Sequence, residues 1–244
     1  MIHALSNNSG VCLAEAMVAM AAGAVILSTT FQALALFESK LTAQQSLISR
    51  HQDQRLGLHV LVEELRLAGT GTPKDTPAML ALGAQELEFT ANLDNLRTVL
   101  TEPVSALQQD LPVLDGSNWN EGKRIVICSA DLCAEGLLAR DGRRTSLNLT
   151  ASLGAAFPAG SEVFVSNRVR YYVSAISGGK KNVMRQIDGG ANAIIGDVTQ
   201  FQLDYFNKQG QPTRDAASVS RVRIEIAVGH DRQGVVSVVG LRGR

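Results

Sequence analysis

The sequence predicts an α+β fold, in which one long N-terminal helix precedes a head built from antiparallel β-strands. An almost unbroken apolar run extends from Ala16 to Phe37, and a helical spacing of apolar side chains continues as far as Ala68. Beyond Thr70 the spacing of apolar residues changes from 3.6 to two, which is the period of a half-buried strand. The change in period marks the boundary between helix and head.

The composition of the 244 residues excludes several classes of protein. Hydrophobic residues make up 45% and the formal net charge is zero, so the chain is not of the intrinsically disordered type. A mean hydropathy of +0.06 excludes a protein of many membrane spans. The balanced charge also disfavours a nucleic-acid partner, because no excess of Lys and Arg is available to neutralise phosphates.

The apolar run from Ala16 to Phe37 has the length of a membrane span, for which about 20 helical residues suffice. A cleaved signal peptide is the alternative, with Ala33-Leu34-Ala35 as the cleavage site. Two features favour a retained anchor. No Lys or Arg precedes Lys40, although an export signal normally begins with a positive charge, and the helical pattern continues beyond Ala35.

The second half of the helix is amphipathic, and we expect one of its faces to pack on the head. That face carries Leu58, Leu61, Val62, Leu65 and Ala68. The other faces are expected to carry Arg55, Glu63, Glu64 and Arg66. Gly69 provides the stop signal, and Gly23 and Gly57 each weaken the helix by ~1 kcal/mol relative to alanine.

Alternating apolar and polar residues predict the strands of the head. They are expected over residues 86–91, 124–128, 162–173, 183–187, 198–206, 219–228 and 234–241. Glycine-containing pairs such as Asp141-Gly142, Gly189-Gly190 and Gln209-Gly210 provide turns between them. These strands predict an antiparallel sheet that packs against the amphipathic half of the helix.

Glu15 is the unusual residue of the N-terminal segment, because a carboxylate at the edge of an apolar span is costly unless it is paired or reaches the headgroups at the membrane interface. Its context, Gly10-Val11-Cys12-Leu13-Ala14-Glu15 followed by the apolar run, resembles the start of type IV pilins and pseudopilins. The resemblance implies that a prepilin peptidase cuts after Gly10 and methylates the new terminus at Val11. Glu15 would then be the fifth-position acid that acts in subunit assembly. The chain departs from the family in having Val11 where Phe is usual, and in lacking a basic leader.

Further segments resemble minor pilins of the PilW type and GspJ-type pseudopilins of type II secretion. They include Gln54-Arg55-Leu56-Gly57-Leu58, the segment Glu64 to Gly69, and Val169-Arg170-Tyr171-Tyr172-Val173. With this resemblance the chain divides into a leader peptide (1–10), a transmembrane or filament-core half-helix (11–37), an amphipathic half-helix (38–69) and a periplasmic β-rich head (70–244). The resemblance implies a fold of the pilin type.

Cys128 and Cys133 are expected to form a disulfide if the head is exported, because that compartment oxidises thiols. The alternative is two small buried thiols. A bridge across so short a loop contributes at most ~2–3 kcal/mol.

No motif for catalysis, metal binding or a cofactor is found, so we expect a protein that is not an enzyme. The sequence has four histidines, none at the spacing of a metal-binding pair, and Asp188-Gly189-Gly190 is better explained as a turn than as a phosphate loop. The expected partners are the prepilin peptidase, other pilins or pseudopilins, and the inner membrane. The expected function is assembly or priming of a type IV pilus, with a type II secretion pseudopilus as an alternative. A periplasmic binding or adhesion domain, released by signal peptidase or anchored by its helix, is the alternative from another class.

Overall fold

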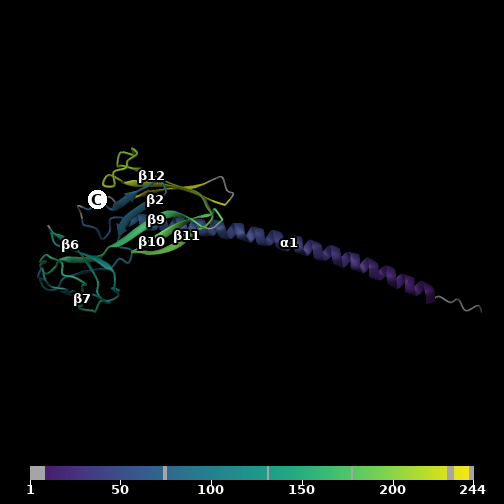
Figure 1. Cartoon of the computed structure of the whole chain (residues 1–244), viewed down its shortest axis with the longest axis horizontal. Helices are drawn as coiled ribbons and strands as arrows, with labels where there is room; N and C mark the ends of the chain where they lie inside the picture. The colour runs from purple at the N-terminus through teal and green to yellow at the C-terminus, as the bar shows by residue number, and fades with distance from the viewer. Residues whose placement is uncertain (1–8, 74–75, 131, 177, 230–233, 242–244) are drawn as a thin grey trace, which may run out of the picture. The chain divides into compact units, whose positions relative to one another are not determined.

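The structure, a computed structural model, describes residues 9–73, 76–130, 132–176, 178–229 and 234–241 (Figure 1). The chain divides into two units, residues 1–50 and residues 51–244. Its only described helix, α1 (Ser9–Arg66), has 58 residues and contributes to both units. The helix predicted from about Val11 to Ala68 is therefore confirmed to within two residues at each end.

Within the first unit, α1 is apolar on every side from Ala16 to Leu27. Residues Leu13–Thr42 form a helix long and apolar enough to cross a membrane, and no described part of the chain buries it. The exposed large apolar side chains include Leu13, Met17, Val18, Met20, Val25, Ile26, Leu27, Phe31, Leu34, Leu36 and Phe37. A cleaved N-terminal signal sequence has the same properties, so the structure is consistent with both an anchor and a signal.

Three consecutive hydroxyl side chains, at residues 28–30, interrupt the apolar run from Ala16 to Phe37, and each bonds to the helix backbone. Ser28 Oγ donates to the carbonyl of Val25 at 2.9 Å, and Thr30 Oγ1 donates to the carbonyl of Ile26 at 2.8 Å. Thr29 Oγ1 contacts both carbonyls, at 3.1 and 2.9 Å. These bonds remove the need for water, so the hydroxyls are compatible with a lipid environment.

The second unit begins with the last turns of α1, which pack on two antiparallel sheets. The first sheet has the order β1-β2-β9-β10-β11, and the second has the order β12-β13-β14. Their strands are β1 (Met79–Leu82), β2 (Glu86–Ala91), β9 (Asn167–Ala175), β10 (Lys181–Ile187), β11 (Gly190–Ile195), β12 (Val198–Phe206), β13 (Arg221–Val228) and β14 (Val235–Gly240). The predicted helix face of Leu58, Leu61, Val62, Leu65 and Ala68 is buried in the core between them. That prediction is confirmed.

A second core lies in the same unit under two smaller sheets. One has the order β3-β8-β5-β6 and the other pairs β4 with β7. These strands are β3 (Arg97–Val99), β4 (Asp110–Pro112), β5 (Arg124–Cys128), β6 (Cys133–Leu137), β7 (Ser146–Asn148) and β8 (Glu162–Val165). Trp119 and Phe157 are almost fully buried in this core. In Figure 1, β6 and β7 lie apart from β2, β9, β10 and β12.

The structure corrects the prediction of one sheet and one of its strands. The described part of the head contains four sheets, and the strand expected over residues 162–173 is two strands, β8 and β9. The chain changes sheet at Ser166, so that Val165 pairs with Ile125 while Val169 pairs with Phe89. Both Val165 and Ser166 are buried, which breaks the alternation expected of a single strand.

Candidate functional site

The predicted cleavage site lies at the start of α1. Gly10 and Val11 are helical, while residues 1–8 of the predicted leader lie outside the described residues. Glu15 lies in the second turn and is exposed, as are its neighbours Leu13 and Met17. No other residue from Leu13 to Phe37 carries a charge. Cleavage after Gly10 and the assembly role of Glu15 stay predictions.

The structure confirms the disulfide between Cys128 and Cys133. Their sulfur atoms are 2.05 Å apart, and the two residues lie directly opposite each other where β5 pairs with β6. The bridge therefore closes the end of this hairpin, next to the second core of the head.

Helix α1 is bonded to the head through Glu64, which the sequence analysis placed on a polar face. That placement is wrong, because Glu64 is buried against β9 and β10. Its Oε2 accepts a hydrogen bond from the Tyr171 hydroxyl at 2.5 Å and another from Arg185 Nε at 3.0 Å. Arg185 Nη2 donates to the other oxygen, Oε1. The carboxylate thus accepts a bidentate contact from the Arg185 guanidinium and a hydrogen bond from the Tyr171 hydroxyl. These bonds compensate its charge inside the core.

The sequence contained a signal for this burial that was missed. Position 64 lies three residues after Leu61 and four before Ala68, so it falls on the same helix face as two residues of the predicted core. The partner of Glu64, Arg185, lies 121 residues away, and no local pattern links the two.

Two further residues hold α1 against the sheets. The amide of Gln54 donates from its Nε2 to the backbone carbonyl of Ile226 in β13 at 3.1 Å, in a buried position. Gly57 faces β11, where an added Cβ would lie 2.8 Å from the carbonyl oxygen of Ile194. The glycine that weakens the isolated helix is therefore required for close contact between helix and strand.

Glu64 and the surrounding core also shift the pKa values of Tyr171 and Arg185. Burial raises the pKa of Tyr171 above its ordinary value, and the negative charge of Glu64 raises it further. The hydrogen bond to Glu64 likewise raises the pKa of Arg185. Both shifts keep the two donors protonated in the folded head.

These shifts predict a loss of stability at alkaline pH. Below pH 10, the ordinary tyrosine value, Tyr171 keeps its proton in both states, so its ionisation adds no pH dependence. Above it the unfolded chain releases that proton and the folded head does not, so stability falls by up to about 1.4 kcal/mol per pH unit for this group. We expect urea unfolding between pH 8 and 11 to show a smaller alkaline loss in Tyr171→Phe. An unchanged slope would contradict the assignment.

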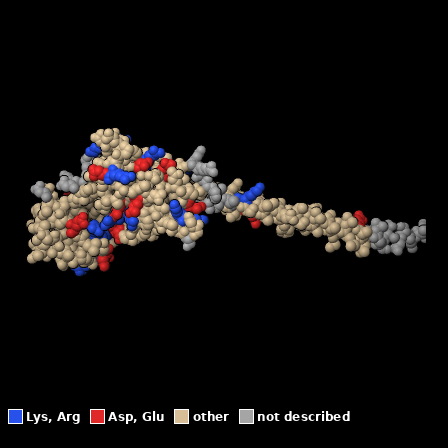
Figure 2. Space-filling model, turned by 45° about the horizontal axis from the view of Figure 1, so that its top comes forward, with Lys and Arg blue, Asp and Glu red and all other residues tan. Residues whose placement is uncertain are grey.

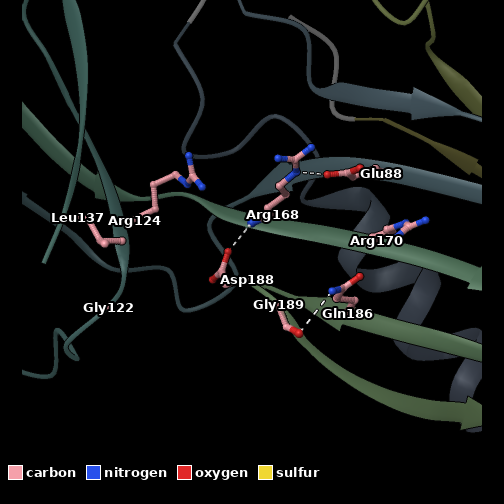
Figure 3. Close-up of a pocket in the computed structure, with 9 residues that line it drawn as sticks. All are labelled: Glu88, Gly122, Arg124, Leu137, Arg168, Arg170, Gln186, Asp188 and Gly189. Carbon is pink, nitrogen blue, oxygen red and sulfur yellow. Dashed lines mark hydrogen bonds and ion pairs between the residues drawn. The ribbon is translucent and has the colours of Figure 1, made fainter.

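Charged side chains gather on the head, whereas the apolar part of α1 is nearly free of them (Figure 2). One charged hollow of about 360 Å³ contains three guanidinium groups from β5 and β9 (Figure 3). It is lined by Glu88, Gly122, Arg124, Leu137, Arg168, Arg170, Gln186, Asp188 and Gly189.

Each guanidinium of this hollow already has a carboxylate partner. Arg168 pairs with Glu88, Arg170 Nε donates to Glu86 at 2.8 Å, and Arg124 Nη1 donates to Glu135 at 3.1 Å. The hollow is therefore a set of internally paired charges, and it offers an anion no unpaired cation among these three. No group of three or more His, Cys, Asp or Glu residues in the described part of the chain could hold a metal ion.

Asp188 at the rim of the hollow is part of a turn, as the sequence analysis expected. Its carboxylate accepts bonds from the backbone N–H of Arg168 and from the side-chain amide of Asn167, both at 2.8 Å. Asp188 and Gly189 both have positive φ angles, 48° and 103°, and connect β10 to β11.

Comparison with known proteins finds no matching family model, no matching curated protein and no matching solved structure. The fold and the candidate site define an α+β protein with one N-terminal helix that is long and apolar enough to span a membrane. Any more specific function must be inferred from the residues themselves.

Proposed function

We propose that this chain is a minor pilin or pseudopilin, a structural subunit that assembles or primes a type IV pilus. The observation that carries the proposal is Glu15, the single charged residue from Leu13 to Phe37, five positions after Gly10. In this proposal the prepilin peptidase cuts after Gly10, the new terminus at Val11 is methylated, and the head faces the periplasm while α1 lies in the inner membrane.

The exposed apolar half of α1 supports the proposal. This half of α1 is apolar on every side from Ala16 to Leu27, and no other described residue of the chain covers it. Such a helix needs lipid or other apolar helices around it. Both environments are available to a subunit that passes from a membrane into a filament core. The Cys128–Cys133 disulfide fits a head in an oxidising compartment.

Glu15 has a specific physical role in this proposal. Its carboxylate neutralises the terminal amine of Val11, in its own chain or in an adjacent subunit. In an apolar helix bundle such a pair acts as a register device, because any other alignment leaves a charge unpaired in a medium of low dielectric constant.

Two other candidates have their own supporting observations. A pseudopilin of a type II secretion system shares the Gly10-to-Glu15 pattern and would use the same residues in a different assembly. A periplasmic binding or adhesion domain, released after Ala35 or kept on its helix, is consistent with an N-terminal apolar helix but gives Glu15 no role.

The experiment that tests the proposal replaces Glu15 with alanine in the organism that produces the protein. We expect Glu15→Ala to remain in the membrane fraction, while the number of pili, or the amount of secreted substrate, falls by about tenfold or more. Pilus number or secretion falls because the terminal amine of Val11 loses the carboxylate that neutralises it.

Glu38→Ala is the matched control, since Glu38 is an exposed carboxylate of the same helix outside the apolar run. It should assemble normally. Comparing pilus number with secretion distinguishes the two assemblies, and a Glu15→Ala strain that resembles wild type in both would refute the role of Glu15.

A further inference from the structure

The turn between β9 and β10 is an exposed projection at one end of the five-stranded sheet. It is closed by a hydrogen bond from the backbone N–H of Ile176 to the carbonyl of Lys180 at 2.8 Å. Gly178 and Gly179 have φ angles of 85° and 75°, and a Cβ added to either would have no described neighbour within 4 Å. The turn is therefore surrounded by open space.

The hairpin of β9 and β10 extends beyond the core that holds the sheet to α1. Val183 of β10 is fully buried in that core, whereas Lys181, two positions earlier on the same face of the strand, is exposed. Lys180 is exposed as well, and Ile176 is 44% exposed although its side chain is apolar. The projection thus combines two ammonium groups with one uncovered apolar side chain.

The two lysines are available to bind a partner. Neither forms an ion pair with a carboxylate in the described part of the chain, whereas Lys123 elsewhere in the head pairs with Asp94. The turn at the other end of β10 has the opposite character, because it carries Asp188, whose carboxylate accepts internal hydrogen bonds. The β9–β10 turn therefore presents two positive charges that no described carboxylate neutralises.

The β9–β10 turn lies at the end of the head where α1 enters it. The first residue of β9 pairs with Ala91, which also bridges to Ala68 just after the end of α1. Further along the sheet, Val183 of β10 pairs with Ile195, whose side chain lies against α1 at Gly57. The strands therefore run back along the helix, and the turn follows on the side from which the helix arrives.

A short length of chain connects this end of the head to the candidate membrane span. The span ends at Thr42, and Gln54 is the first described residue of α1 that is buried against the head. A helix covers the separation between these two residues in about 18 Å. So short a tether gives the head an effective concentration of about millimolar at a bilayer that holds the span, so weak contacts with that bilayer become populated.

We propose that the β9–β10 turn is a membrane-contact site of the head. Lys180 and Lys181 bind the phosphates of anionic lipids, and Ile176 enters the interfacial layer of the bilayer that holds α1. The apolar side chain beside the charges favours lipid over a nucleic acid, whose phosphate backbone offers no apolar layer. The tether favours the bilayer over a freely diffusing partner. The inference rests on α1 being retained as an anchor, which the proposed function shares, and not on cleavage after Gly10 or on assembly.

The test places a fluorophore at the turn of the full, uncleaved chain. The chain carries Cys12→Ala and Ile176→Cys, so that the environment-sensitive dye NBD reacts with the introduced thiol and not with the Cys128–Cys133 bridge. It is reconstituted into vesicles of phosphatidylcholine, with or without about a third of phosphatidylglycerol. We expect emission at shorter wavelength in the anionic vesicles, and quenching by nitroxide-labelled lipids that is about threefold stronger there.

Charge reversal identifies the groups that bind. Lys180→Glu combined with Lys181→Glu should abolish the difference between the two kinds of vesicle, because the turn then repels anionic lipid. Arg140→Glu combined with Arg143→Glu is the matched control, since it makes the same change of charge at two exposed arginines between β6 and β7. This control should retain the difference.

Amide hydrogen exchange provides a second readout, in which Ile176 is kept and no dye is attached. The backbone of residues 175–181 should exchange about threefold more slowly in anionic than in neutral vesicles, because lipid contact restrains the turn. Equal quenching and exchange in the two kinds of vesicle would overturn the proposal, as would signals that the reversal of residues 180 and 181 leaves unchanged.

Two further outcomes would also overturn the membrane-contact site. Signals that follow the number of protein copies per vesicle, and not the lipid charge, would indicate that the turn contacts another protein chain. A chain that does not float with neutral vesicles would show that α1 is not an anchor. Since neither cleavage nor pilus assembly takes place in these vesicles, a chain that floats but lacks the lipid contact would leave the role of Glu15 untouched.

Discussion

Glu64→Ala is expected to lower the free energy of unfolding of the head by about 3 kcal/mol. The substitution leaves Arg185 without its carboxylate partner and removes the acceptor of the Tyr171 hydroxyl. The Arg185 side chain retains 25% of its exposure, so water compensates part of the loss. Urea unfolding of the full chain in detergent, followed by circular dichroism of the strands, measures the effect.

The neighbouring residue provides a matched control for this prediction. Glu63 pairs with Arg66 one turn further on, but both side chains are about half exposed. Glu63→Ala should therefore change the stability by no more than about 0.5 kcal/mol. Equal effects of the two substitutions would show that the buried ion pair does not hold the helix to the sheet.

Gly57→Ala is expected to destabilise the head by about 2 kcal/mol, although alanine is the better helix former by ~1 kcal/mol. The added methyl group would overlap the side chain of Ile195 and approach the carbonyl oxygen of Ile194 to 2.8 Å. A backbone carbonyl cannot move aside as a flexible side chain can, so helix and strand must separate.

Gly23→Ala is the control for helix propensity. Gly23 lies in the same helix, and an added Cβ there has no neighbour within 4 Å. The same unfolding measurement should show no loss of head stability in Gly23→Ala. A head that is as stable with Gly57→Ala as the wild type would contradict the close contact between α1 and β11.

Local periodicity was enough to predict the long helix, the apolar residues of its buried face and several of the strands, although not β9, which was expected as part of a single strand over residues 162–173. The helix face of Leu58, Leu61 and Leu65 is buried as expected, and the strand predicted over residues 198–206 is β12 with the same bounds. Both features depend only on the spacing of side chains a few positions apart, so one segment of the sequence is enough to reveal them.

Features that depend on distant contacts could not be predicted in this way. Strands β3, β4 and β7 have three residues each, too few for an alternation to be recognised. The change of sheet at Ser166 depends on pairing with β5 and β2, which lie roughly 40 and 80 residues earlier in the chain. Contacts over such separations leave no local signal in the sequence. For the same reason the sequence does not indicate the partner of Glu64, whereas it does indicate the Cys128–Cys133 disulfide, because the two residues are five positions apart and export would place them in an oxidising compartment.

The central claim is that this chain matures as a pilin-like subunit, and N-terminal mass spectrometry of the mature protein tests it most directly. The proposal predicts a chain that begins with N-methylated Val11. A chain that begins at Leu36 would contradict it in favour of a domain released after Ala35. A chain that retains Met1 would instead indicate a membrane-anchored protein outside the prepilin pathway.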